Sequence, residues 1–362
     1  MTKNKQYNRI KLVLSIASSI FSFLLLSAFV ISGYSEKLLS FASAYSDSGY
    51  LQFIIYVAIA GIASSIISFP LSYYSSFHIE HKFDLSNQTF FAWMKENLKG
   101  AAVGSVIGLP ILMVFYYFIT EFTETWWLPF AIAMFLFSVV LAQIVPVVIL
   151  PLFYKVTPLE DEELTARIKA LADKSGLRIK NVYKFDMSKN TKKANAAFTG
   201  LGKTKRIILG DTLLEDYTPD EIETVIAHEM GHYAKKHIVK NLIFGTLSSF
   251  LTLWLIAELY RISLPWFGFE SITNIAAFPI LSIWAMLIGI IQTPLSNYLS
   301  RKYEYEADNY AIKMTNKKEA FISTLTRLNE QNLGDEEPHP LVEWYSYSHP
   351  SIKKRIAYIE SL

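Results

Sequence analysis

The amino-acid sequence predicts an α-helical integral membrane protein with six transmembrane helices and an α+β domain outside the membrane. The first observation is composition: 52% of the 362 residues are hydrophobic and only 18% are charged, whereas soluble domains carry about 25% charged residues. The second is that long apolar stretches alternate with polar segments. The third is a metal-binding pattern in one of those polar segments.

Six apolar stretches are long enough to cross a hydrocarbon core of about 30 Å, which requires about 20 helical residues. They run over residues 12–31, 50–74, 101–120, 127–150, 242–260 and 275–298. The first stretch is too long for the apolar region of a signal peptide, so we expect it to remain as a membrane helix. Tryptophans fall near the ends of these stretches, as they do at membrane interfaces: Trp126, Trp127, Trp254 and Trp266.

Lysine and arginine are unequally distributed between the connecting segments. Residues 1–11 contain four and residues 75–100 contain three, whereas residues 32–49 contain one and residues 120–126 contain none. Because basic residues remain on the cytoplasmic side, we expect both termini and the polar segments to be cytoplasmic. The membrane would be a bacterial inner membrane or an endoplasmic reticulum membrane, depending on the organism.

These stretches predict four parts of the chain. Residues 1–153 form an N-terminal membrane domain with four transmembrane helices, and residues 241–298 form a transmembrane hairpin. The polar parts are residues 154–240 and 299–362. Because a hairpin returns the chain to the side it left, we expect both polar parts to fold together as one cytosolic α+β domain.

The first polar part has signals for helix and strand. Residues 157–160 (Thr-Pro-Leu-Glu) predict a capping box that opens a helix, and Gly176 would end it. Residues 178–187 alternate weakly, as a strand does. A Gly-Lys-Thr turn at residues 202–204 lies between two strand-like runs and predicts a β-hairpin.

A second helix is predicted to begin at Thr218. Thr218 and Glu221 have the spacing of a capping box, and Pro219 suits the first helical position. The helix-forming residues that follow contain no breaker until Gly231. The segment HEMGH is therefore expected to be helical.

His228 and His232 of that segment are four residues apart, so their imidazoles leave the same helix face. This spacing lets two nitrogens bind one zinc ion, and Glu229 is placed to take a proton from a water molecule at the zinc. The alternative is a surface helix with two unrelated histidines. Ala227 and other small apolar residues along the helix argue against a solvated face.

A candidate third ligand is Glu304, in the segment SRKYEYEADNYA. A catalytic zinc ion needs three protein ligands and an open position, and two histidines with one glutamate form an established set. Asp308 lies four residues after Glu304 and could reach the site to orient a zinc ligand. The alternative is a solvated charged helix with pairs of opposite charges.

HEMGH followed by SRKYEYEAD resembles the M48 zinc metalloproteases, and most closely their integral-membrane CAAX prenyl protease branch, the Ste24 type. Residues 69–90, 188–214 and 347–356 also resemble segments of that branch, so the resemblance covers about residues 50–360. Eukaryotic members carry an additional N-terminal transmembrane helix, whereas six are expected here. The resemblance implies a zinc-metalloprotease domain of the gluzincin-like type with one zinc ion per chain.

The resemblance also implies roles for further residues. Asn195 would lie on an edge strand to which the substrate peptide adds as another strand; the alternative is a plain turn residue. His349 and Arg355 would contact the substrate and the developing charge; the alternative is a basic patch near lipid head groups. Family analogy gives Asp308 a catalytic, proton-donating role, whereas its spacing favours orienting a ligand. His237 is expected to face away from the two metal-binding histidines.

The function implied is a membrane zinc metalloendopeptidase that cleaves near the C-termini of lipidated or membrane-associated substrates, as in CAAX-box protein processing. The expected partners are a peptide or protein substrate, prenylated or not, and the lipid bilayer, with no nucleic acid. A quality-control protease for misfolded membrane proteins is the alternative within the same chemistry. From another class, the alternative is a six-span transporter or a non-catalytic scaffold; the intact metal pattern argues against a scaffold. The chain contains no cysteine, which excludes disulfides and thiol catalysis.

Overall fold

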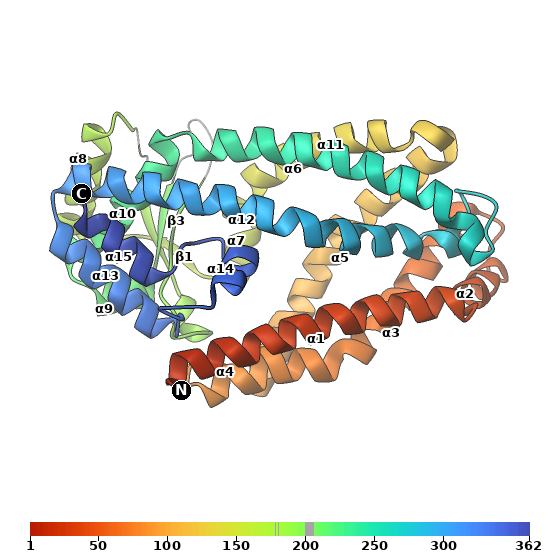
Figure 1. The fold of residues 1–362 in the computed structure, drawn as a ribbon, viewed down its shortest axis with the longest axis horizontal. Helices are drawn as coiled ribbons and strands as arrows, with labels where there is room; N and C mark the ends of the chain where they lie inside the picture. Colours follow the sequence, from red (N-terminus) through yellow and green to blue (C-terminus); the bar gives the residue numbers. More distant parts are fainter. Residues whose placement is uncertain (178, 180, 200–205) are drawn as a thin grey trace.

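A computed structural model describes residues 1–177, 179, 181–199 and 206–362. Figure 1 shows long helices that extend away from one end of the molecule, where the small β-sheet lies. Both chain termini lie at this same end. The two polar parts of the chain therefore come together, although the hairpin separates them in sequence.

Among the residues that the structure describes, six helices are long and apolar enough to cross a membrane, which confirms the six predicted spans. They contain α1 (Lys3–Ile31), α3 (Gly49–Tyr73), α5 (Phe90–Glu121), α6 (Trp127–Ile144), α11 (His237–Ser263) and α12 (Pro279–Thr315). Leucine, isoleucine and valine side chains on these helices point outward, as a lipid-facing surface requires. For example, Val13, Ile16, Ile20 and Leu24 of α1 are all more than half exposed.

Two of these helices change pitch near prolines. Helix α3 continues through a π-helical turn, η1 (Tyr74–His78), into α4 (Ile79–Lys82). Helix α6 continues through a second π-helical turn, η3 (Val145–Ile149), which contains Pro146 and leads into α7 (Leu150–Phe153). Proline removes one backbone donor, so a local widening of the helix is an expected response.

Shorter helices connect or cap these elements. The α-helices among them are α2 (Tyr34–Ser43), α8 (Glu162–Lys174), α9 (Asp211–Asp216), α10 (Pro219–Ala234), α13 (Lys318–Gln331), α14 (Pro340–Ser346) and α15 (Ile352–Glu360). The 3₁₀ turns are η2 (Thr123–Thr125), η4 (Met187–Lys189), η6 (Leu264–Phe267) and η7 (Ile275–Ala277).

The sheet has four strands in the order β1-β2-β4-β3. They are β1 (Val156–Pro158), β2 (Asn181–Phe185), β3 (Ala196–Thr199) and β4 (Arg206–Gly210). β2 and β4 pair in parallel, and the other two pairs are antiparallel. The two strands of the predicted hairpin are confirmed as β3 and β4, whereas its Gly-Lys-Thr turn lies outside the described residues. β3 occupies one edge of the sheet.

The capping box predicted at residues 157–160 is wrong. Thr157 and Pro158 belong to β1, because Thr157 pairs with Lys184 of β2 and its backbone is extended. Helix α8 begins later, at Asp161, whose carboxylate accepts a hydrogen bond from the Leu164 backbone N–H. Its predicted end is confirmed, since Gly176 has a positive φ of 67° just after the helix.

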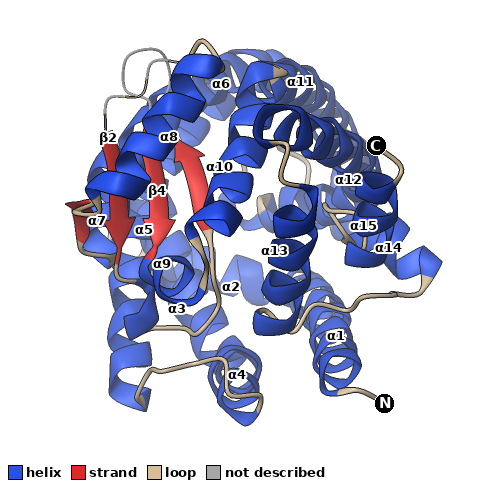
Figure 2. Cartoon of the chain, turned by 90° about the vertical axis from the view of Figure 1, so that its left-hand side faces the viewer, coloured by secondary structure: helices blue, strands red, loops and turns tan. Residues whose placement is uncertain are grey.

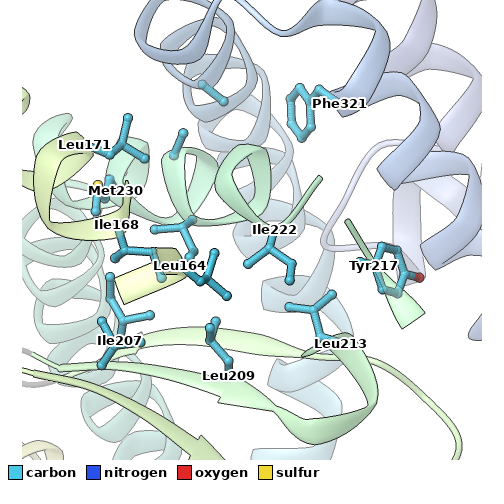
Figure 3. Packing of buried hydrophobic residues seen from close by; sticks show 14 of the residues in the cluster. Leu164, Ile168, Leu171, Ile207, Leu209, Leu213, Tyr217, Ile222, Met230 and Phe321 are labelled. Atoms are coloured by element: carbon cyan, nitrogen blue, oxygen red, sulfur yellow. The ribbon is translucent and has the colours of Figure 1, made fainter. Parts of the chain in front are cut away.

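Helices α8 and α10 pack on the sheet and form its hydrophobic core. Figure 2 shows both helices beside the strands. In Figure 3, Ile207 and Leu209 of β4 point toward side chains of both helices. The buried contacts include Leu164, Ile168 and Leu171 of α8 and Ile222 and Met230 of α10. Each such side chain contributes about 1.5–3 kcal/mol by leaving water, so this core fixes α10 relative to the sheet.

The N-terminal helices contact the segment that leads into β3. Glu80 of the α3–α4 region accepts a hydrogen bond from the Tyr7 hydroxyl (2.8 Å) and pairs with Lys11 of α1 (3.0 Å). Its second oxygen lies 3.1 Å from the Lys193 ammonium. Because Lys193 lies two residues before Asn195, these contacts fix the start of the edge strand relative to the membrane helices.

Candidate metal centre

The centre forms where α10 crosses α12. Gly231 lies at the crossing: a Cβ atom there would be 3.0 Å from the Ala307 Cα atom. Only a residue without a side chain allows the two backbones to approach so closely. His228 and His232 flank Gly231 on α10, and Glu304 lies one turn before Ala307 on α12. Their side chains therefore converge beside the crossing.

The three side chains have the spacing that a tetrahedral metal ion requires. The Nε2 atoms of His228 and His232 lie 3.2 Å apart. Each is close to one oxygen of Glu304, at 3.4 Å and 3.3 Å respectively. Two ligand atoms bound at 2.0–2.1 Å with tetrahedral angles lie about 3.3 Å apart. Among the described residues, these three form a group whose ligand atoms lie close enough together to hold a metal ion; it is called the metal-binding group below.

The Glu304 carboxylate supports the same interpretation. It is only 3% exposed, and its Oε2 atom accepts no hydrogen bond from any residue that the structure describes. A buried carboxylate oxygen that accepts no hydrogen bond is costly, because it has lost its hydration. The guanidinium of Arg355 lies 3.4 Å away and balances part of the charge. A bound cation would supply the missing partner, so the residues present fit a metal ion.

Asp308 contacts the first histidine from the side opposite to the site. Its Oδ1 atom lies 2.9 Å from the His228 Nδ1 atom, and its side chain is fully buried. Arg355 donates to both oxygens of Asp308, with the Nε–Oδ2 distance at 2.9 Å. This arrangement matches the spacing-based interpretation, in which Asp308 orients His228; its role remains a prediction.

The electrostatics of the centre favour a positive charge. Burial disfavours the charged form of His228, but the negative charges of Glu304 and Asp308 outweigh burial and raise the pKa of His228 to about 10. The two carboxylates therefore favour a positive charge at this imidazole. A cation held at Nε2 would lie near the same carboxylates.

The expectation that His237 faces away from the pair is wrong. A helix that continued past His232 would place His237 on another face, but α10 ends at Ala234 and Lys236 adopts a left-handed φ of 58°. The chain therefore turns, and α11 begins at His237. This turn brings the His237 Nδ1 atom to 3.0 Å from the His232 Nδ1 atom.

A cavity of about 170 Å³ opens beside the ligands. Its lining comes from several elements and brings most of the predicted site residues together: Asn195, His228, Glu229, Glu304, His349 and Arg355. Asn195 is exposed and directly precedes β3, and its carbonyl accepts a hydrogen bond from Gly210 N–H (2.9 Å). The His349 Nε2 atom lies 3.5 Å from Glu304. The cavity therefore connects the metal ligands with the edge strand.

Two contributors to the centre were not identified from the sequence. Glu306 is two residues from Glu304, so a helical pattern places it on another face, and yet it contacts His237 at 3.0 Å. Gly231 was noted only as a helix breaker, although its missing side chain permits the crossing. The presence of glycine between the two histidines is the signal that could have indicated a close approach.

The chain is similar to known families along its whole length. Residues 158–362 match the family model described as Peptidase family M48. Residues 1–155 match the model described as CAAX prenyl protease N-terminal, five membrane helices.

Individual relatives agree with these matches. CAAX prenyl protease 1 of Saccharomyces cerevisiae is 35% identical over 327 residues, covering 85% of this chain and 72% of the relative. An uncharacterized metalloprotease of Bacillus subtilis, YhfN, is 31% identical over 360 residues, covering 98% of this chain and 84% of the relative. The crystal structure of S. mikatae Ste24p superposes with a TM-score of 0.89 at 31% identity, covering 99% of this chain and 88% of that one.

Proposed function

This chain belongs to peptidase family M48, and we propose that it uses a zinc ion held by His228, His232 and Glu304 to cleave prenylated proteins near their C-termini. That it is a multi-pass membrane metalloendopeptidase follows from the family and from its six apolar helices. The choice of zinc rests on the ligand set of two histidines and one glutamate. The choice of substrate rests on relatives named CAAX prenyl protease 1.

The observation that carries the proposal is the 170 Å³ cavity, because it places Glu229 and the metal ligands beside the edge strand. A bound zinc ion would polarise the scissile carbonyl and make a water molecule more acidic. The Glu229 carboxylate would accept a proton from the attacking water and then deliver it to the nitrogen of the leaving amine. Asp308 would hold His228 through its Nδ1 atom, at 2.9 Å.

The substrate would bind along β3. An edge strand presents backbone donors and acceptors, so an extended peptide can pair with it whatever its sequence. Asn195 at the start of β3 would contact the peptide near the bond that is cleaved. His349 and Arg355, which line the same cavity, would contact the substrate carbonyl and the charge that develops on it.

The orientation proposed for this function places the sheet end of the molecule in the cytoplasm. Residues 1–153 and 241–298 would form the membrane part, and residues 154–240 and 299–362 the catalytic domain. The unequal distribution of lysine and arginine supports this orientation.

Cleavage of a farnesylated peptide, compared with the same peptide without the farnesyl group, tests the substrate. We expect the purified protein to show a kcat/KM at least about tenfold higher for the farnesylated peptide. This preference needs only about 1.4 kcal/mol, which the burial of about two CH₂ groups supplies. A chelator should abolish cleavage, and added zinc should restore it.

The outcomes separate the two protease functions. Equal cleavage of both peptides would contradict prenyl recognition and favour a quality-control protease. Cleavage that survives complete removal of metal would contradict the proposed chemistry as a whole.

A further inference from the structure

A chain of three polar side chains runs from the second candidate metal-binding histidine to α12. The His232 Nδ1 atom lies 3.0 Å from the His237 Nδ1 atom. The His237 Nε2 atom lies 3.0 Å from the Glu306 Oε2 atom. The three residues come from α10, the first position of α11 and α12. We propose that His237 and Glu306 are positioning residues that fix the tautomer and the orientation of His232 for metal binding.

The direction of the hydrogen bonds follows from the metal site. The Nε2 atom of His232 faces His228 and Glu304, at 3.2 Å and 3.3 Å. If that nitrogen binds a metal ion, its Nδ1 atom must carry the proton and donate it. The Nδ1 atom of His237 must then accept, so its own proton resides on Nε2. That nitrogen points at Glu306, whose carboxylate only accepts. One arrangement of protons therefore satisfies every member.

The surrounding residues hold this arrangement in place. His237 is only 1% exposed, and its ring stacks on Tyr303 at 4.2 Å with an angle of 13° between the planes. The Lys240 ammonium lies 3.4 Å from the Glu306 carboxylate and helps to balance its charge. The left-handed turn at Lys236 aims His237 back at α10. A buried imidazole with both nitrogens paired has little freedom to rotate.

The two metal-binding histidines are thus supported in parallel ways. His228 is held by Asp308 directly, at 2.9 Å. His232 is held by a carboxylate through an intervening imidazole. Partners of this kind raise the basicity of a metal-binding histidine and fix its ring, and their loss typically lowers metal affinity by about 10–100-fold. The proposal rests on the metal site proposed above and assigns it a second support.

Zinc affinity, measured by competition with a chromogenic chelator on the purified full-length protein, tests the proposal. His237→Phe keeps an aromatic ring that can stack on Tyr303 but can neither accept nor donate, and it should lower zinc affinity by about 10–100-fold. Glu306→Leu removes the acceptor that faces His237 Nε2 and should lower zinc affinity in the same direction. His237→Gln keeps an acceptor and a donor. Its zinc affinity should remain within about threefold of wild type, well short of the loss expected for His237→Phe.

A matched control uses a histidine elsewhere. His78 also stacks on a tyrosine, Tyr74, at 5.2 Å and 16°, but it is exposed and is absent from the metal-binding group. His78→Phe should leave zinc affinity unchanged. Wild-type affinity in His237→Phe would overturn the proposal. Equal losses in His237→Phe and His237→Gln would also overturn it, because the hydrogen bonds would then not matter.

Two further outcomes keep the proposal separate from the function. If His237→Phe does not fold, Glu306→Leu decides the result, and unchanged affinity in that variant contradicts the proposed chain. If the wild-type protein binds zinc tightly but cleaves no prenylated peptide, the substrate assignment fails while the support of His232 stands. If the wild-type protein binds no zinc, the metal site itself is wrong.

Discussion

Glu229 has a different task from the histidines on either side of it. It follows His228 directly, and neighbouring residues on a helix point about 100° apart. It lines the cavity with the ligands but is not a member of the metal-binding group. We therefore expect it to transfer protons without holding the metal ion.

Glu229→Gln separates these two tasks. The amide keeps the size of the side chain and its helix propensity but cannot accept a proton. We expect the metal content and the melting temperature to remain near wild type, while turnover falls by about 10²-fold or more. Metal content and peptide cleavage should be measured on the same preparation. Near-normal cleavage would exclude Glu229 as the general base.

At the scale of single residues, the sequence predicted the candidate metal ligands but not the contact that His237 makes with one of them. The spacing of His228 and His232 on a helix, and of Glu304 and Asp308 on another, is local, and the structure brings all four together. The contact of His237 with His232 depends on a turn at Lys236, a residue type that rarely adopts a positive φ. Nothing in the local pattern indicates that turn.

Helix α10 is the element that carries two of the ligands, and its first turn is strongly fixed. Thr218 and Glu221 form the predicted capping box, with the Thr218 N–H 2.9 Å from the Glu221 carboxylate. Ser323 and Arg327 of α13 also donate to this carboxylate, at 2.8 Å and 2.7 Å. Burial alone would raise the pKa of Glu221, but these donors outweigh it and hold the pKa below its usual value of 4.5.

This shift gives Glu221→Gln a pH-dependent effect. A carboxylate whose pKa is lowered by folding stabilises the protein above its unfolded pKa, and that contribution is lost as the pH falls through the folded pKa. We expect the variant to have a lower melting temperature at pH 7, by an amount that corresponds to about 1.5–3 kcal/mol. The difference should shrink below about pH 4.5. A difference that is equally large at pH 7 and pH 3.5 would show that charge is not involved.

At the scale of elements, the long helices and the β3–β4 pair followed from the sequence, because length, hydropathy and a turn signal are local properties. The short strand β1 did not. Two of its three residues, Thr157 and Pro158, belong to a helix-start pattern, and pairing with β2 makes them extended. Tertiary pairing overrode the local preference in this case.

For the whole molecule, we predict that the end that contains the β-sheet lies in the cytoplasm, and labelling can test this orientation. The chain has no cysteine, so single cysteines can be introduced without background. Ser48→Cys and Ser271→Cys lie between spans at the end opposite the sheet, and Thr2→Cys and Ser361→Cys lie next to the two termini; all four positions are exposed.

Labelling of intact cells with a membrane-impermeant maleimide should reach Ser48→Cys and Ser271→Cys only. The two variants near the termini should react after the membrane is permeabilised. The basic residues near the termini favour this result, because they stay on the cytoplasmic side. Labelling of either terminus in intact cells would reverse the proposed orientation.

The central claim is that His228, His232 and Glu304 hold one metal ion where α10 crosses α12. The zinc content per chain, measured by mass spectrometry on purified protein, tests it most directly. Glu304→Ala should lose most of the metal and still fold, since it removes a buried charge without a hydrogen-bond partner at Oε2. His349→Ala is the matched control, because His349 lies 3.5 Å from Glu304 but outside the metal-binding group.

We predict about one zinc ion per chain in the wild-type protein and in His349→Ala, and close to none in Glu304→Ala. Full zinc content in Glu304→Ala would contradict the account, because two histidines alone hold zinc weakly. Loss of zinc in His349→Ala would contradict it as well, since His349 would then be a ligand.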